Sequence, residues 1–402
     1  MTRAFALARV TLLEGLRARA WAVWVLYALI LACLPALLSG IPPSAWGRSA
    51  VTTAYQAAAL LTIASVTIAG ARLVPRALES RVLFAVLTKP VRRAEYVAGG
   101  ALGIASLAAV LAAGMGFVGG GGLSLSASVR STAYSRQTGT VEARHETDGT
   151  VSWTCRAASP SGALRLVIPV RAQTWDGTAL ALRWEGGDPE RTENVPRSVR
   201  AWEEPVPPEA WRDGAARLVV SVPGGNPREA LGEAPAGRLL ASDRTFLLPW
   251  CASLLVAWVV ATLLGIAAFV ASVFVSWRLA FLAALTFGIC GANRDLLHQM
   301  PNVLTRQTLQ TTFSRAPHSH AHDPAPEEAA NWIDTGLSWA GRLLSALGGA
   351  LPDLTRAQAA PTLARSLSIP PRALGSLALG AGAFGCLLLA AGVLGFARRE
   401  FV

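Results

Sequence analysis

Long uninterrupted runs of apolar residues constrain this chain more than any other feature of its sequence. Six of them stand out, at residues 20–41, 51–73, 96–120, 246–275, 279–291 and 374–397. A run of about 18 or more apolar residues is typical of a helix that crosses a bilayer. The fifth run is short and needs its neighbours to reach across, whereas the fourth must tilt, break near Gly265 or extend beyond the bilayer. The sequence therefore predicts an α-helical polytopic membrane protein with six spans.

The distribution of charge predicts which side of the membrane each segment faces. The chain has a formal net charge of +11, yet residues 124–243 hold 14 basic and 15 acidic residues, so the basic excess flanks the spans. This pattern is typical of membrane orientation and not of nucleic-acid binding, which we do not expect. Residues 1–19, 72–95, 277–278 and 398–402 together hold 13 basic and 4 acidic residues. By the positive-inside rule, both termini are predicted to be cytoplasmic, in a multi-pass protein of the cytoplasmic membrane.

Six spans divide the chain into segments with different expected locations. Residues 1–19 precede the first span, and residues 20–122 hold spans one to three with an inner loop at 72–95. Residues 123–243 are expected outside, residues 244–297 hold spans four and five, residues 298–373 form a second outside segment, and residues 374–402 hold the last span and the tail.

The segment 123–243 has the pattern of short β-strands. Apolar residues alternate at Val151/Trp153/Cys155, Leu164/Leu166/Ile168/Val170, Leu180/Leu182/Trp184 and Leu218/Val220/Val222. Alternating strands separated by glycine- and proline-rich turns predict an inserted all-β, sandwich-like extracytoplasmic domain. Four consecutive glycines at residues 119–122 are expected to act as a hinge before it. Trp202 and Trp211 are expected in the core or an interface, with a binding edge as the alternative.

The second outside segment contains an amphipathic pattern and a histidine cluster. Residues 331–347 have one broad apolar face that includes two tryptophans, which predicts a helix at the outer membrane interface or over the bundle. His318, His320 and His322 alternate in a stretch rich in proline and alanine. Alternate histidines are able to bind zinc or copper, but a polar loop without metal is the favoured interpretation.

The sequence predicts no catalytic site. Lys89 is the only lysine of the chain, so no G-x-x-x-x-G-K-[ST] phosphate-binding loop is possible. No nucleophile elbow and no HExxH motif is present. Any uphill transport must therefore draw its energy from a partner, and we expect no cofactor in this chain.

Two cytoplasmic segments have the pattern of amphipathic helices, and the inner loop is the one that suits binding to such a partner. Residues 1–19 form an imperfect amphipathic helix with Phe5, Ala8, Leu12, Leu13 and Leu16 on one side and Glu14 and Arg17 on the other. This segment is either an interfacial helix or a simple basic flank. The inner loop is predicted to form a basic helix with Glu79 inside an apolar stripe, which suits either docking to another protein or contact with lipid headgroups.

The inner loop resembles that of ATP-binding cassette (ABC) exporter permeases of the second type. The matching positions are Glu79, Lys89, Pro90, Val91, Arg93, Glu95, Tyr96 and Gly99, with Arg81 inside the same loop. The opening ARVTLLEGLRARAW, with Glu14 and Arg17, is similar to the N-terminal interfacial helix of that family, and the closing FARREF to its C-terminus. The chain departs from the family at Gly100, where a lysine is common, and in the insertion of about 120 residues between spans three and four.

This resemblance implies a permease subunit that exports a substrate and works as a homodimer or pseudo-dimer. It further implies a separate ABC ATPase subunit that binds ATP and Mg²⁺. This subunit would bind the inner loop around Glu79, which then acts as the coupling loop. The alternative is a membrane-anchored structural or sensory protein whose extracytoplasmic β domain binds a ligand or partner.

Overall fold

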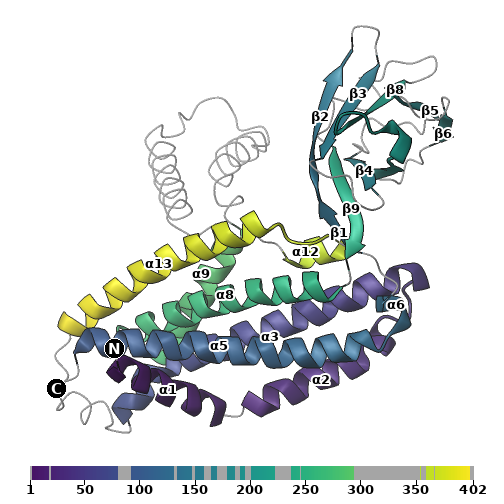
Figure 1. Cartoon of the computed structure of the whole chain (residues 1–402). Coiled ribbons are helices and arrows are strands. Elements are labelled where there is room, and N and C mark those ends of the chain that lie inside the picture. The colour runs from purple at the N-terminus through teal and green to yellow at the C-terminus, as the bar shows by residue number, and fades with distance from the viewer. Residues whose placement is uncertain are drawn as a thin grey trace, which may run out of the picture.

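The structure is a computed structural model in which helices run side by side and the strands gather near one end (Figure 1). It describes residues 2–17, 20–79, 92–130, 134–146, 150–157, 164–169, 179–185, 191–194, 201–221, 237–244, 246–293, 354, 359–365 and 367–398. The expected helix at 331–347 and the histidine cluster at 318–322 lie outside these residues.

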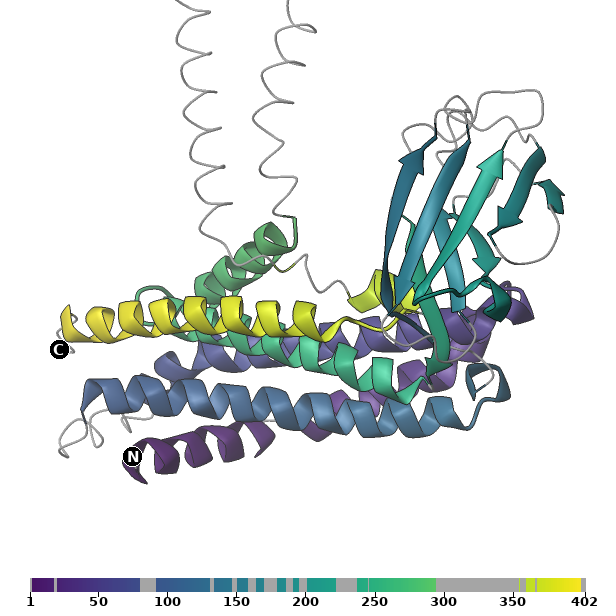
Figure 2. The same cartoon turned by 45° about the horizontal axis from the view of Figure 1, so that its top comes forward.

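The helical part consists of long apolar helices and a few short ones. They are α1 (Thr2–Arg17), α2 (Ala20–Leu37), α3 (Pro43–Glu79), α5 (Arg93–Ser124), α6 (Ala127–Arg130), α8 (Leu247–Ala271), α9 (Trp277–Ala292), α12 (Ala359–Ala364) and α13 (Pro371–Arg398). Figure 2 shows α5, α8 and α13 aligned lengthwise beside α3. The start of α1 and the end of α13 lie at the same end of this bundle (Figure 1).

Four of these helices are long and apolar enough to cross a membrane: α3, α5, α8 and α13. Helix α2 meets that test only together with α1, from which it is bent by 50°. Helix α9 has 16 residues, or about 24 Å, which is short against a hydrocarbon core of about 30 Å. Each of the six predicted runs contains a helix, and among the described residues four of these helices, or five with the bent pair, are suited to cross a membrane. The structure supports a membrane-embedded protein, and six crossings stay a prediction.

Three helices differ from their predicted extents. Helix α3 runs unbroken to Glu79, so the first part of the expected inner loop continues the second apolar helix. Helix α8 passes through Gly265 without a break and ends at Ala271, before the apolar run does. The expected hinge at residues 119–122 is wrong, because these glycines are helical and belong to α5. Gly119 there packs against Tyr27 and Trp250, so the glycine serves close helix contact.

Close approach through glycine also joins α3 to α8. A Cβ atom placed on Gly70 of α3 would lie 2.3 Å from the carbonyl oxygen of Gly265 in α8. No larger residue fits at that distance, so the two backbones are in direct contact. In membranes, where lipid is as apolar as leucine, such backbone proximity is a main source of helix association.

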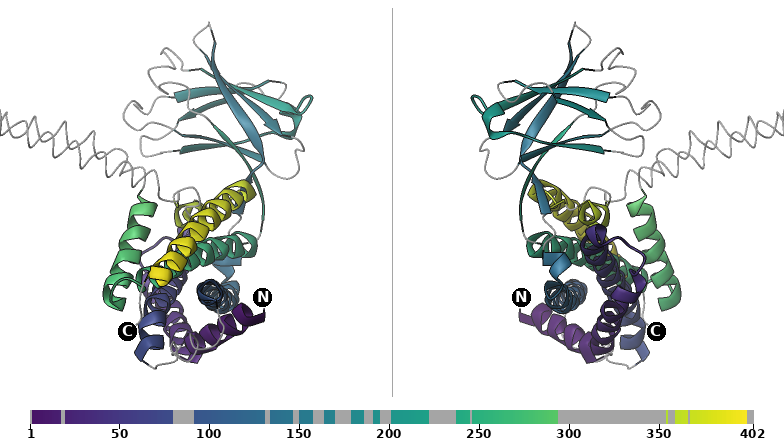
Figure 3. Two further views of the ribbon diagram at one scale, coloured as in Figure 1. Left: turned by 90° about the vertical axis from the view of Figure 1, so that its left-hand side faces the viewer. Right: turned by 90° about the vertical axis from the view of Figure 1, so that its right-hand side faces the viewer.

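The strands form two antiparallel sheets. They are β1 (Tyr134–Gln137), β2 (Gly139–His145), β3 (Val151–Ala157), β4 (Leu164–Pro169), β5 (Ala179–Trp184), β6 (Arg191–Asn194), β7 (Ala201–Pro205), β8 (Ala215–Ser221) and β9 (Arg238–Arg244). One sheet has the order β1-β9-β4-β7 and the other β2-β3-β8-β5-β6. Figure 3, which looks along the helices, shows the strands on the α13 side of the bundle. The four strands predicted from alternation are β3, β4, β5 and β8, and all four are confirmed.

Both sheets contribute to one hydrophobic core. Trp153 and Leu218 from the five-stranded sheet and Leu166 and Ile168 from the four-stranded sheet are fully buried in it. Trp211 packs against this core and is partly buried, as the favoured interpretation expected. The alternating apolar residues of β3, β4, β5 and β8 therefore share one core, as strict alternation favours.

The four-stranded sheet is attached to the helices at the start of α13. The backbone N–H of Ser368 donates a hydrogen bond of 2.9 Å to the carbonyl oxygen of Ser135 in β1. Ser135 also forms a parallel bridge with Leu367. Since α13 begins at Pro371, this contact links the sheet to the last apolar helix within a few residues.

Candidate functional site

The described residues that carry the predicted coupling motifs gather at one end of the helix bundle. Glu14 and Arg17 lie in the last turn of α1, Glu79 ends α3, and Arg93 begins α5. We call this region, with Arg72 and Arg76 of α3, the charged end. Of the other predicted positions, Glu95 and Tyr96 lie in the first turn of α5, whereas Arg81, Lys89 and Pro90 lie outside the described residues.

Glu14 joins the N-terminal helix to the end of α3. Its Oε1 lies 3.5 Å from Nε of Arg76, and the two side chains are 53% and 60% exposed. An ion pair so exposed contributes about 0–1 kcal/mol to stability. The contact therefore orients α1 against α3 without locking it, and it is weak enough to break when another charged group approaches.

Helix α1 is held mainly by packing against α5. Cβ atoms placed on Gly99 and Gly103 of α5 would lie 2.7 Å from Cβ of Leu7 and 2.5 Å from Cβ of Thr11. The first residues of the chain thus form a helix docked on the bundle. Its predicted apolar stripe is divided, however, because Ala8 is buried here while Phe5 is 74% exposed.

The first turn of α5 joins the charged end to the last helix. The guanidinium of Arg93 donates a hydrogen bond of 2.8 Å to the carbonyl oxygen of Ala397 in α13. Positive charge at a helix C-terminus is favourable because it offsets the helix dipole. The carboxylate of Glu95 accepts a hydrogen bond of 3.0 Å from the backbone N–H of Arg92, which satisfies one unpaired donor at the start of α5.

Tyr96 brings the inner-loop motif into contact with the closing FARREF motif. Its ring centroid lies 5.5 Å from that of Phe396 in an edge-to-face arrangement and 6.4 Å from that of Phe269 in α8. Phe396 opens the closing FARREF motif and is buried. Two motifs about 300 residues apart in the sequence are therefore parts of one aromatic cluster.

An arginine–tryptophan stack completes the charged end on the α9 side. Cζ of Arg72 lies 4.3 Å from the ring centroid of Trp277, and Cζ of Arg278 lies 5.7 Å from it. A guanidinium over an indole ring is attracted to the negative face of the ring. Beside this stack is an open groove of about 350 Å³ lined by Arg72, Pro75, Arg76, Glu79 and Trp277.

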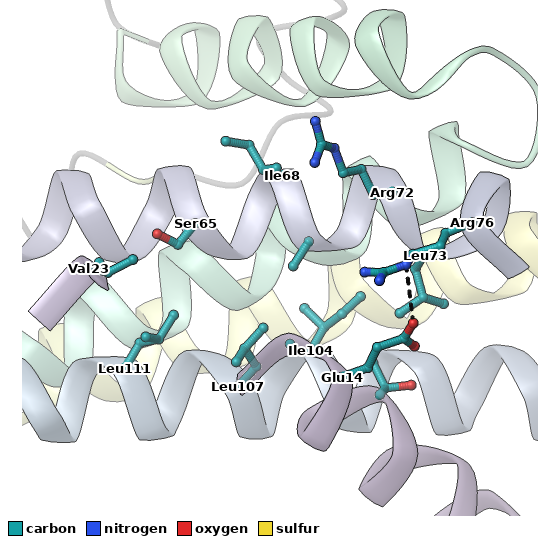
Figure 4. A pocket seen from close by; sticks show the side chains of 13 residues that line it. Glu14, Val23, Ser65, Ile68, Arg72, Leu73, Arg76, Ile104, Leu107 and Leu111 are labelled. Atoms are coloured by element: carbon teal, nitrogen blue, oxygen red, sulfur yellow. Dashed lines mark ion pairs between the residues drawn. The ribbon is translucent and has the colours of Figure 1, made fainter. Parts of the chain in front are cut away.

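A second cavity lies between α1, α2, α3 and α5, with a volume of about 260 Å³ (Figure 4). Its polar end is formed by Glu14 and Arg76, and its walls are formed by apolar side chains of α3 and α5. The sequence pattern did not single out Arg76, or the cavity beside it. A usable signal was present, because Arg72 and Arg76 are four residues apart and so share one helix face.

The part of the chain that the structure describes contains no cluster of metal-ligating side chains. Within the described ranges, no group of three or more His, Cys, Asp and Glu side chains is placed to hold a metal ion. His318, His320 and His322 lie outside them. What this part of the chain presents is charge, a groove and a cavity, which suit binding.

Comparison with known proteins does not assign this chain to a family. No protein-family model matches the chain, and neither a curated protein nor a solved structure matches it. The relation to ABC permeases therefore stays a resemblance carried by short motifs.

Proposed function

We propose that this chain is the membrane-spanning permease subunit of an ABC exporter, powered by a separate ATPase subunit that binds ATP and Mg²⁺. The observation that supports this most is convergence at the charged end. Glu14, Glu79, Arg93 and Tyr96 come from three helices and lie at one end of the bundle. A partner that binds at this end contacts the ends of several helices at once.

The proposed topology has six crossings, both termini in the cytoplasm, and the charged end facing the ATPase. The strands then form an extracytoplasmic sandwich. The basic excess of the segments at the charged end supports this orientation, because cytoplasmic flanks of spans are rich in arginine and lysine.

The proposed mechanism is a movement passed from the partner to the helices. ATP binding in the ATPase shifts the bundle only if the ATPase binds one arrangement of the charged end more tightly than the other. Helix α3 carries such a movement directly, because it is continuous from Pro43 to Glu79. Its backbone contact at Gly70 passes the movement on to α8, and two copies of the permease enclose the transport path.

Co-purification with an ATPase tests this proposal. The partner to co-express with the full chain is a Walker-type ATPase encoded by a neighbouring reading frame, and the search for such a frame is the first step of the test. We expect wild type to retain the ATPase and Glu79→Arg to lose it or to uncouple its ATP hydrolysis, because a reversed charge opposes the partner's groove. Glu209→Arg, the same reversal on an exposed residue near the strands, is the matched control. A complex formed and coupled equally well with Glu79→Arg refutes the proposed docking.

A further inference from the structure

The cavity between α1, α2, α3 and α5 has the polarity of an amphiphile. Figure 4 shows Glu14 and Arg76 together at one end, and Val23 and Leu111 at the other. The walls between them are formed by Ile68, Ala69, Leu73, Ile104 and Leu107. Because α3 rises about 1.5 Å per residue, Ser65 and Arg76, which both line the cavity, are about 16 Å apart along the helix. That length matches about half of one bilayer leaflet plus its headgroup region.

The polar end of the cavity carries both signs of charge. Two guanidinium groups, of Arg72 and Arg76, and one carboxylate, of Glu14, belong to the cavity lining, and Glu79 lines the adjoining groove together with both arginines. Arg72 stacks on Trp277, so its charge is held at the entrance by α9. Arg76 points across the entrance toward Glu14 in Figure 4, at an N–O distance of 3.5 Å. A charge-assisted hydrogen bond is normally about 2.7–2.9 Å long, so the contact between Glu14 and Arg76 is a weak one that another anion is able to replace.

We propose that this cavity binds a membrane lipid with an anionic headgroup. The phosphate lies against Arg76 and Arg72, and one acyl chain lies along the apolar walls formed by Leu107 and Leu111. Basic pockets between membrane helices on the cytoplasmic side are suited to such headgroups, because the phosphate gains paired charge and the tail stays in an apolar environment. The site does not depend on the proposed ATPase partner, but its cytoplasmic location rests on the proposed topology.

Glu14 then competes with the lipid for Arg76. With no lipid bound, the carboxylate pairs with Arg76, and with lipid bound the phosphate replaces it. Removing the arginine and removing the carboxylate must therefore change lipid affinity in opposite directions. A purely structural role of the pair predicts the same direction for both variants.

Native mass spectrometry of the purified full chain in a nonionic detergent tests the proposal. The probes are lysophosphatidylglycerol, which is anionic, and lysophosphatidylcholine of the same chain length, which is zwitterionic. We expect the anionic probe to bind more tightly to wild type. Arg76→Gln should weaken it about tenfold, as expected for one lost charge-assisted hydrogen bond. Glu14→Gln should tighten it by up to about fivefold, because an exposed competing pair is removed.

Two further variants separate the cavity from general surface charge. Ala69→Leu adds bulk inside the cavity and should weaken the binding of the anionic probe. Arg9→Gln makes the same charge change as Arg76→Gln on the exposed face of α1 and should leave the affinity unchanged. Glycerol phosphate, which has the same anionic group and no acyl chain, should not compete at equal concentration.

Three results overturn the proposal. They are equal affinity for the two lysolipids, equal loss in Arg76→Gln and Arg9→Gln, and full competition by glycerol phosphate. If Arg76→Gln folds poorly, the sign of the Glu14→Gln effect decides the matter, because a weaker affinity in that variant contradicts competition for Arg76. All of these measurements omit the ATPase, so they stand or fall separately from the proposed transport role.

Discussion

The four consecutive glycines of α5 give the sharpest test of the helix packing. Residues 119–122 are helical, and neighbours in this run face different surroundings. A Cβ atom on Gly119 would lie 2.4 Å from Oη of Tyr27 and 2.7 Å from Cζ2 of Trp250. A Cβ atom on Gly121 would have no neighbour within 4 Å. Alanine at these two positions therefore makes the same chemical change with opposite expected results.

The magnitudes follow from the two environments. Tyr27 and Trp250 are 0% and 1% exposed, so neither ring has room to move away from a new methyl group. Overpacking of this kind costs about 1–3 kcal/mol. Gly121→Ala creates no clash and removes the conformational freedom of glycine in a helix, so it should stabilise by up to about 1 kcal/mol. The helix-propensity gain is the same for both alanines, so the two variants should differ by the clash alone, roughly 1–3 kcal/mol in free energy of unfolding.

Unfolding of the full chain in mixed micelles by increasing sodium dodecyl sulfate, followed by far-UV circular dichroism, measures this difference. Gly119→Ala should unfold at a lower mole fraction of the denaturing detergent than wild type, and Gly121→Ala at an equal or higher one. A hinge at this position would make both alanines rigidify the same joint and act in the same direction. Equal effects of the two substitutions would therefore refute the helix contact deduced here.

Three other predictions concern single contacts. Burial raises the pKa of the Cys155 thiol from about 9 to about 12, so this thiol should resist maleimide labelling at pH 8 in a variant that keeps it as the sole cysteine. The thiol of the unfolded chain loses its proton at a lower pH than the folded one. The free energy of unfolding should therefore fall by about 1.4 kcal/mol per pH unit between about pH 9 and 12, with no such slope below pH 9. A Cys155→Val variant that keeps the same slope contradicts this prediction. A double-mutant cycle of Glu14→Gln and Arg76→Gln should give a coupling of at most about 1 kcal/mol that high salt removes, and a larger, salt-independent value would mean a buried pair. A cycle of Tyr96→Leu and Phe396→Leu should give about 0.5–1.5 kcal/mol from the edge-to-face contact, measured by the same detergent unfolding, and zero coupling would separate α5 from the end of α13.

The parts of the fold that sequence reasoning predicted are those that depend on local pattern. Each of the six apolar runs is helical, and each of the four alternating segments is a strand. Both outcomes have a local cause, because burial along a helix or a strand is written as spacing in the sequence. Helix ends were less accurate, as α3 shows by continuing to Glu79 beyond its apolar run. Charged residues are able to extend a helix beyond the bilayer, so hydropathy alone does not mark its end.

The glycines show why the hinge was predicted wrongly. In an aqueous loop, four glycines give a flexible joint, and the sequence offers no sign that another helix lies beside them. In the bundle, Gly119 has Tyr27 and Trp250 as neighbours, from segments far away in the chain. The same residue type therefore permits close packing here, and only the identity of its neighbours decides between the two roles.

The sequence by itself determined which segments are membrane-type helices and which are strands. The reason is that the length and period of an apolar pattern already distinguish a segment surrounded by lipid from one with a single buried face. Only the tertiary structure decided which distant residues meet: Glu14 with Arg76, Arg93 with Ala397, and Tyr96 with Phe396. The cavity between α1, α2, α3 and α5 was likewise decided only by the tertiary structure. Contacts of this kind depend on how helices pack against each other, and that packing is set by complementary shape between segments that no local pattern compares.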